Sequence, residues 1–245
     1  IRAYFTANLP SIPFEDIWNL LERIHELREL ATHPYLLDLI RKQIPALNAK
    51  VERNETIRAV DLYAGFISDW SHERNLYHNV LQPEDKNELM ELLAIHMWRQ
   101  GRRSLPARDM ERWLLDTLVL TPRWQLVYGD LLKPKSQESL LSDFRTASFV
   151  SRWEGDTFRF AHTSLQEYCH LAQALENGDL SAWDLPEPSR ETFDFLGQHL
   201  LTLTEGQRHK ALANIAQLLS DCGNPENSRL NALRYHLQAS AKKLL

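Results

Sequence analysis

The sequence predicts a mostly α-helical protein, in which a helical bundle is followed by a winged-helix domain with one small β-hairpin and then by further helices. Leu occurs 42 times against 16 for Val and Ile together, and only 8 of the 245 residues are Gly. Because Leu favours helices while β-branched residues favour strands, this composition is helical. Apolar residues also recur every three or four positions along most of the chain, which is the period of a helix.

The first region, residues 1–82, is expected to be a helical domain. Pro34 suits the first turn of a helix, where its missing N–H removes no hydrogen bond, so one helix should begin there. A later helix should end near Trp70, and the polar segment 71–83 should connect it to the next region. The apolar stripe of the earliest helix consists of Ile17, Leu20, Leu21, Ile24 and Leu27.

The second region, residues 83–178, has the element order of a winged helix. The only strong strand signals of the chain, residues 149–153 and 157–160, are joined by Glu154-Gly155-Asp156, which suits a three-residue hairpin loop. A helix should follow the hairpin and end at Asn177-Gly178. Before the hairpin, helices are expected around residues 89–96, 110–118 and 138–144, with a loop over residues 121–136.

The third region, residues 179–245, is expected to be a second helical domain. It follows a linker that contains Pro186 and Pro188. Its apolar stripes fall within residues 193–203, 212–219 and 230–237, and they show no fixed-period repeat.

Composition and spacing exclude several classes of function. The net charge of −5 argues against a general binder of nucleic acid or of anionic membranes, and no run of about 18 apolar residues predicts a membrane span. The eight glycines never lie closer than nine residues apart, so no phosphate-binding loop of the GxGxxG or GxxxxGK[ST] type can be written. Histidines never recur at the spacing of a helical metal site. We therefore expect no catalytic residues, no metal ligands and no enzymatic activity from this chain alone.

The start of the sequence and its two cysteines predict the cellular location of the protein. Cys169 and Cys222 form no CxxC motif and predict neither a disulfide framework nor a zinc site. With no charged-then-apolar leader at the start, they favour a reducing, cytoplasmic location. Because the sequence begins with Ile1 rather than Met, we treat it as a piece of a longer polypeptide.

The most informative stretch follows the hairpin, where His162 precedes a predicted helix. Two overlapping capping boxes are available there, Thr163 with Gln166 and Ser164 with Glu167. Either box places His162 just before the helix N-terminus, where free N–H groups and the helix dipole favour an anion. His162 is therefore a candidate donor to a phosphate oxygen, and the alternative is a histidine held at the junction by packing.

Four stretches in order resemble the NACHT-type STAND NTPases, which are multidomain ATP/ADP switches of immunity and signalling. The pattern F-x-H-x-S-x-Q-E-Y at residues 160–168 resembles their winged-helix histidine motif. The other three stretches are residues 28–37, similar to LA-x-x-P-x-LL, residues 60–70, similar to LY-x-x-F-x-x-W, and residues 92–98, similar to the first helix of the winged-helix domain.

The resemblance implies a switch in which this chain closes over ADP. In such proteins a nucleotide-binding domain holds ADP or ATP with Mg²⁺, and that part is missing from this sequence, so no cofactor is expected on this chain alone. The family's adenine-packing proline corresponds to Pro34, and its phosphate-contacting histidine corresponds to His162. Nucleotide exchange would release the closed state and allow homo-oligomers to form. Capping and packing, rather than ligand binding, are expected of Gln166, Glu167 and Tyr168.

Two other classes of function stay open. A winged-helix DNA-binding module would place its recognition helix near residues 136–148, but that segment has one arginine against Glu138 and Asp143. A basic cluster over residues 99–108 is interpreted either as a solvated surface or as a surface for a partner or a phosphate. It contains Arg99, Arg102, Arg103 and Arg108. A helical interaction scaffold without nucleotide would explain the leucine stripes, but it does not explain the hairpin or the His162 motif.

Overall fold

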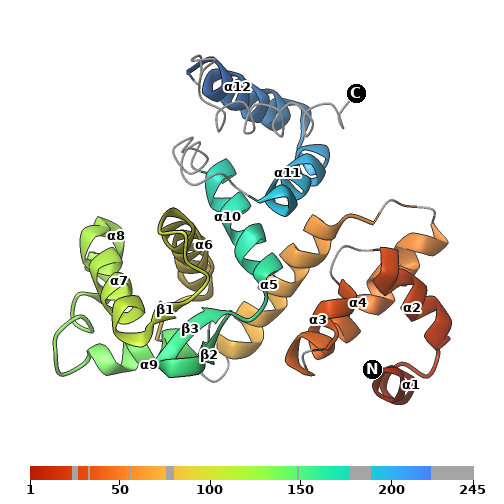
Figure 1. Cartoon of the computed structure of the whole chain (residues 1–245), viewed down its shortest axis with the longest axis horizontal. Coiled ribbons are helices and arrows are strands. Elements are labelled where there is room, and N and C mark those ends of the chain that lie inside the picture. Colours follow the sequence, from red (N-terminus) through yellow and green to blue (C-terminus); the bar gives the residue numbers. More distant parts are fainter. Residues whose placement is uncertain are drawn as a thin grey trace. The chain divides into compact units, whose positions relative to one another are not determined.

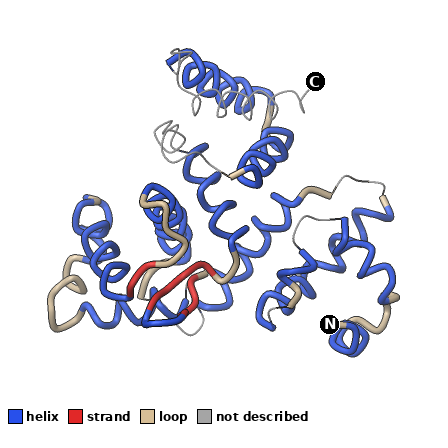
Figure 2. The backbone as a smooth tube through the Cα atoms, viewed as in Figure 1, coloured by secondary structure: helices blue, strands red, loops and turns tan. Residues whose placement is uncertain are grey.

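A computed structural model describes residues 1–23, 27–32, 34–53, 55, 57–75, 80–147, 149–176 and 189–221. These residues form helices and one small sheet, so the prediction of a mostly α-helical protein is confirmed (Figures 1 and 2). The chain divides into two compact units, Ile1–Trp70 and Ser71–Leu245. The predicted helix end at Asn177-Gly178, the linker with Pro186 and Pro188, and the stripe within 230–237 lie outside the described residues.

The N-terminal unit, Ile1–Trp70, is built from four helices and most of a fifth, which continues past Trp70. Side chains that are at most 1% exposed include Phe5, Ile17, Leu21, Tyr63 and Phe66. The helices are α1 (Arg2–Asn8), α2 (Phe14–Arg23), α3 (Leu27–Leu30), α4 (Pro34–Glu52) and α5 (Ala59–Asn75).

The boundaries of these helices correct one prediction and confirm another. Of the stripe expected on the earliest helix, Ile17, Leu20 and Leu21 lie on α2 and Leu27 lies on α3, while residues 24–26 lie outside the described residues. Helix α5 continues to Asn75 instead of ending near Trp70, because neither Gly nor Pro interrupts the chain before Pro83. Pro34 is the first residue of α4, as predicted.

A hydrogen-bonded carboxylate joins α1 to α4. Asp38 Oδ1 accepts hydrogen bonds from the Tyr4 hydroxyl at 2.7 Å and from Arg41 Nε at 2.9 Å. Lys42 Nζ lies 3.1 Å from Asp38 Oδ2. Partial burial by itself would raise the pKa of Asp38, but these donors outweigh it and lower the pKa to about 2. The folded state therefore favours the ionised carboxylate.

We expect Asp38→Asn to remove a pH-dependent part of the stability. Because the folded pKa of Asp38 lies below the unfolded value, its contribution is present above about pH 4 and is lost as the pH falls toward about 2. The difference in unfolding free energy between wild type and variant should therefore shrink over that range. Urea unfolding across this pH range measures it, and a difference that is constant with pH would contradict a role for the charge.

The C-terminal unit, Ser71–Leu245, contains the sheet. Its elements, labelled in Figure 1, are α6 (Pro83–Arg99), β1 (Leu105–Pro106), α7 (Ala107–Leu120), α8 (Pro122–Tyr128), α9 (Gln137–Ala147), β2 (Val150–Trp153), a 3₁₀ turn (Glu154–Asp156), β3 (Thr157–Phe160), α10 (Thr163–Glu176), α11 (Arg190–Thr202) and α12 (Glu205–Asp221).

Two elements of this unit were not predicted. Helix α8 lies inside the segment 121–136 that was expected to be a loop; Pro122 takes its first position, and Trp124 and Tyr128 are buried one turn apart. Strand β1 adds a third strand where only a hairpin was expected. Two residues are too few to show an alternating pattern, so the sequence gives no signal for this strand.

The sheet has β3 as its central strand, with β1 and β2 antiparallel on either side. The predicted hairpin is confirmed: β2 and β3 pair from Val150 opposite Phe160 to Trp153 opposite Thr157. Gly155 in the connecting turn has a φ of 64°, a left-handed conformation that glycine adopts without strain. Strand β1 pairs with the start of β3, with Leu105 opposite Phe158.

Helix α10 follows the hairpin and packs against α6 and α11. Its buried face includes Leu165 and Cys169, both 0% exposed. Burial raises the pKa of the Cys169 thiol, so this cysteine is a packing residue rather than a nucleophile. The Tyr168 ring meets the Phe195 ring of α11 edge-on, with centroids 5.8 Å apart.

A buried ion pair joins the start of α6 to α9. Lys86 Nζ lies 3.1 Å from Asp143 Oδ1, and both side chains are 2% exposed. Asp143 Oδ2 also accepts a hydrogen bond from the backbone N–H of Leu81 at 2.7 Å. The Asp143 carboxylate thus binds both the buried Lys86 ammonium group and a backbone N–H just before α6.

A second carboxylate, Asp85, joins the same helix to α8. Trp124 Nε1 donates to Asp85 Oδ1 at 2.6 Å, and the Tyr128 hydroxyl donates to Asp85 Oδ2. Burial, together with the contact to Asp85, raises the pKa of Tyr128, so its hydroxyl stays protonated as a donor. The same hydroxyl accepts the backbone N–H of Gln82 at 3.1 Å.

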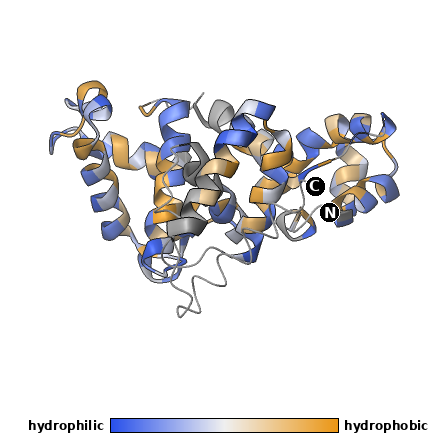
Figure 3. Ribbon diagram, turned by 90° about the horizontal axis from the view of Figure 1, so that it is seen from above, coloured by the Kyte–Doolittle hydropathy of each residue, from blue (hydrophilic) through white to orange (hydrophobic). Residues whose placement is uncertain are grey.

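The helices are amphipathic, with hydrophobic (orange) and hydrophilic (blue) residues mixed along them in Figure 3. In the part of the chain that the structure describes, no helix combines the length and the apolar character needed to cross a bilayer.

We expect Asp143→Asn to destabilise the chain by about 3–5 kcal/mol. The amide keeps an oxygen for the Leu81 N–H but leaves the buried Lys86 charge without its counter-ion. Urea unfolding of wild type and variant measures the loss. Lys133→Ala is the matched control, because Lys133 pairs with Asp130 at the surface, where the two side chains are 68% and 94% exposed, and such pairs contribute less than about 1 kcal/mol. Equal losses in both variants would contradict this role of the buried pair.

Candidate functional site

His162 lies between the last strand of the sheet and helix α10. Strand β3 ends at Phe160 and α10 begins at Thr163, so His162 directly precedes the helix, as the sequence predicts. The backbone N–H of Ala161 donates to the Phe149 carbonyl at 2.8 Å and extends the hairpin pairing toward the helix. The hairpin therefore fixes the position of His162.

The imidazole of His162 caps α10. Its Nδ1 accepts the backbone N–H of Ser164 at 3.2 Å and lies 2.8 Å from the Ser164 hydroxyl. This contact satisfies one of the N–H groups that the first turn of a helix leaves without an internal partner. Because Nδ1 acts as an acceptor here, the neutral ring carries its proton on Nε2. His162 thus supplies an N–H donor at the positive end of a 14-residue helix.

One of the two capping boxes predicted for this helix needs correction. Gln166 is 1% exposed, and its Oε1 accepts a hydrogen bond from Arg103 Nη1 at 3.5 Å, so the predicted pair with Thr163 is wrong. In the other predicted box, the Ser164 hydroxyl lies against His162 and the Glu167 carboxylate faces Arg103. The physical reason for the correction is that α10 begins at Thr163, so that His162 rather than Thr163 caps it and Gln166 contacts Arg103 instead.

Arg103 reaches the start of α10 from the segment between α6 and β1. Its Nη2 lies 3.7 Å from Glu167 Oε1, and its guanidinium carbon lies 4.7 Å from the centroid of the Trp98 ring. The Glu167 side chain is only 3% exposed, whereas that of Arg103 is 52% exposed. A buried carboxylate therefore faces a cation that remains open to solvent on its other side. The sequence marks Arg103 only as one of four clustered arginines and gives no signal for these partners.

The predicted basic cluster is divided between two places. Arg103 contacts α10, while Arg102 lies 4.0 Å from Asp109 and lines a hollow between α6 and α7. The hollow has a volume of about 600 Å³. Arg112 and Asp116 also line it, so its rim carries both signs of charge.

Two neighbouring rings, tilted relative to one another, form a wall of this hollow. His96 and Trp113 line it with ring centroids 5.7 Å apart. Burial, with Arg102 and Arg99 nearby, lowers the pKa of His96. This ring is therefore neutral at physiological pH and adds no positive charge to the hollow.

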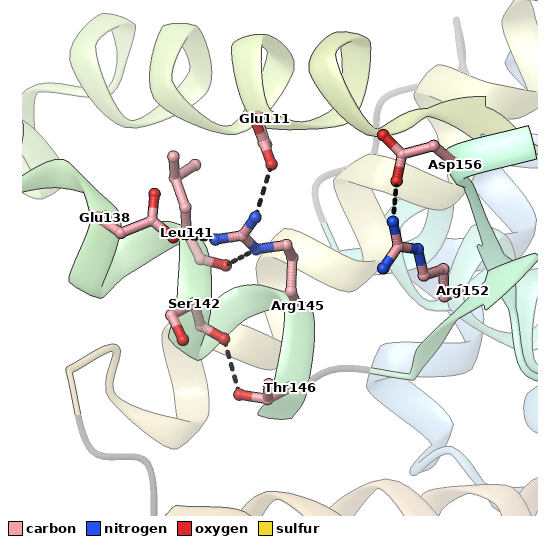
Figure 4. Close-up of polar contacts among 8 residues, drawn as sticks. All are labelled: Glu111, Glu138, Leu141, Ser142, Arg145, Thr146, Arg152 and Asp156. Atoms are coloured by element: carbon pink, nitrogen blue, oxygen red, sulfur yellow. Dashed lines mark hydrogen bonds and ion pairs between the residues drawn. The ribbon is translucent and has the colours of Figure 1, made fainter.

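Helix α9 covers most of the segment 136–148, where a winged-helix DNA binder was predicted to have its recognition helix. Its one arginine, Arg145, donates to Glu111 Oε1 at 3.0 Å and also contacts Glu138 (Figure 4). In the hairpin that follows, Arg152 donates to Asp156 Oδ1 at 2.6 Å. Carboxylates within the same unit thus pair with these two cations.

Pro34, the other predicted nucleotide contact, belongs to the N-terminal unit. It is the first residue of α4, but the surroundings of its side chain and the neighbouring His33 lie outside the described residues. Contact between Pro34 and adenine therefore stays a prediction.

Searches of known proteins add no family to these observations. No family model, curated protein or solved structure matches the chain. Among the described residues, no group of His, Cys, Asp and Glu side chains is placed to hold a metal ion. The donors gathered at the start of α10 are thus the strongest candidate for a binding site.

We expect His162→Ala to lower the unfolding free energy by about 1 kcal/mol, since removal of a helix cap has about this cost. His162→Asn should keep most of the stability, because an asparagine oxygen can accept the Ser164 N–H in place of Nδ1. Thermal and urea unfolding of both variants measure the difference. Equal stability of His162→Ala and wild type would show that the ring does not serve as a cap.

Proposed function

We propose that this chain is the helical and winged-helix part of a NACHT-type STAND switch protein of signalling or immunity. It closes over ADP in the inactive state and rearranges on ATP exchange, so that the protein self-associates. His162 contacts the nucleotide phosphate and Pro34 the adenine, while the nucleotide-binding domain of the same polypeptide supplies the remaining contacts. The observation that carries the proposal is the hydrogen bond from Ser164 N–H to His162 Nδ1, because it leaves the ring proton on Nε2 at the start of α10.

The chemistry at the start of α10 fits an anion. The Nε2–H of His162, the helix dipole and the nearby Arg103 guanidinium all favour negative charge. Carboxylates suited to Mg²⁺ are not grouped among the described residues. We therefore assign phosphate contacts to this chain and the metal ion to the nucleotide-binding domain.

DNA binding is less well supported as the function. A recognition helix needs cations directed at phosphates and base edges, but Arg145 of α9 contacts Glu111 and Glu138. Asp143 of the same helix is buried against Lys86. A helical scaffold without nucleotide accounts for the core, yet it gives no reason for an imidazole where Ser, Thr, Asp or Asn would cap the helix equally well.

Nucleotide content of the purified protein tests the proposal. The natural polypeptide that contains this chain, with the sequence that precedes Ile1, is purified and denatured, and the released nucleotide is quantified. Wild type should carry close to one ADP per molecule. His162→Asn should bind ADP about 10-fold more weakly. It keeps the helix cap, but its shorter amide cannot place an N–H where Nε2 lies, and a hydrogen bond to a charged group contributes about 1.5 kcal/mol or more.

Thr163→Ala provides the matched control, since Thr163 is exposed and adjacent to His162. It should retain ADP like wild type. Wild-type protein without nucleotide would contradict the switch proposal and favour the helical scaffold. Equal ADP retention by His162→Asn and wild type would remove His162 from the site.

A further inference from the structure

We propose that Arg103 is a second phosphate contact at the start of α10 and that Glu167 competes with the phosphate for its guanidinium. This inference rests on the proposed function, because it adds a residue to the same anion site. Arg103 lies outside α10 and outside the F-x-H-x-S-x-Q-E-Y stretch. It is therefore not one of the residues that the family resemblance carried over.

The sheet register brings Arg103 to this place. Strands β1 and β3 are antiparallel, with Leu105 opposite Phe158. Arg103 lies two residues before Leu105 in the chain, and Phe160, the last residue before Ala161-His162, lies two residues after Phe158. The residues that precede β1 thus run beside the segment that leads to the helix cap.

The contacts of Arg103 hold its guanidinium there without using all its donors. A guanidinium has five N–H donors, and the contacts to Gln166 Oε1 and Glu167 Oε1 are long, at 3.5 and 3.7 Å. Charge-assisted bonds to a carboxylate or phosphate are usually shorter than 3 Å. With the side chain 52% exposed, Arg103 can reach a phosphate while it stays beside Trp98.

A buried hydrogen-bond donor without a partner lies next to the contact between Arg103 and Gln166. Gln166 is 1% exposed, and among the described residues its Nε2 has no hydrogen-bond partner. Because Nε2 and Oε1 share one carbon, this donor lies beside the oxygen that faces Arg103. A buried amide donor without a partner is costly, and an anion drawn to Arg103 would supply the missing acceptor.

If Glu167 competes with phosphate for Arg103, substitutions of these two residues should have opposite effects on the affinity for ADP. Arg103→Ala should weaken ADP binding about 10-fold, as loss of one charge-assisted contact does. Glu167→Gln should strengthen ADP binding several-fold, because it removes the competing carboxylate. The binding of adenosine, which has no phosphate, should change in neither variant.

Stability effects are separated from phosphate contact by a double variant. Arg103→Ala alone leaves the Glu167 carboxylate buried without this cation and lowers stability for that reason, whereas Arg103→Ala with Glu167→Gln removes both charges of this contact. The double variant should unfold like wild type and still bind ADP about 10-fold more weakly. Arg108→Ala, an exposed cation of the same sequence cluster, should behave as wild type.

Calorimetric titration of the nucleotide-stripped natural polypeptide with ADP and with adenosine tests the inference. If wild type and Arg108→Ala bind ADP equally, while the Arg103 variants lose affinity for ADP only, the inference is supported. If His162→Asn loses ADP but the Arg103 variants do not, the Arg103 inference is wrong and the proposed function stands. If wild type binds no ADP, both are wrong.

Discussion

The buried ion pair between Lys86 and Asp143 is the contact on which the C-terminal unit depends. Both side chains are 2% exposed, and two charges removed from water are tolerated only when each satisfies the other. The pair fixes α6 against α9, and Asp85 fixes the same end of α6 against α8. Because α10 packs on α6, the position of α10, the helix that begins after His162, depends on these two carboxylates.

The candidate site draws on three separate parts of that unit. The hairpin delivers His162, α10 provides Gln166 and Glu167, and the segment after α6 brings Arg103. A guanidinium beside Trp98 keeps its place only while α6 and α10 remain packed. Any rearrangement that separates α6 from α10 would therefore move the cation away from the histidine. The geometry suits a site whose affinity for an anion depends on the arrangement of helices.

The sequence predicted those features that local pattern determines. The helical periods, the start of α4 at Pro34 and the hairpin around Glu154-Gly155-Asp156 each depend on a few neighbouring residues, and the structure has all three. The position of His162 before α10 follows from the same local signals. Strand β1 escaped prediction because two residues show no period. Gln166 lies 63 residues from its partner Arg103, and Leu81 lies 62 residues from its partner Asp143. One sequence gives no measure of such long-range contacts.

The winged-helix order does not by itself determine how its elements are used. In a DNA binder the third helix and the wing carry cations outward to phosphates. Here Arg145 of α9 meets two glutamates, and the Asp143 carboxylate turns inward to Lys86. The side chains of α9 are thus used for core packing and local ion pairs. The hairpin has a different role here, because it fixes the residue at which α10 begins. That point carries the imidazole donor and the half-exposed guanidinium, so the anion site that we propose for this unit lies at the start of α10 rather than on α9.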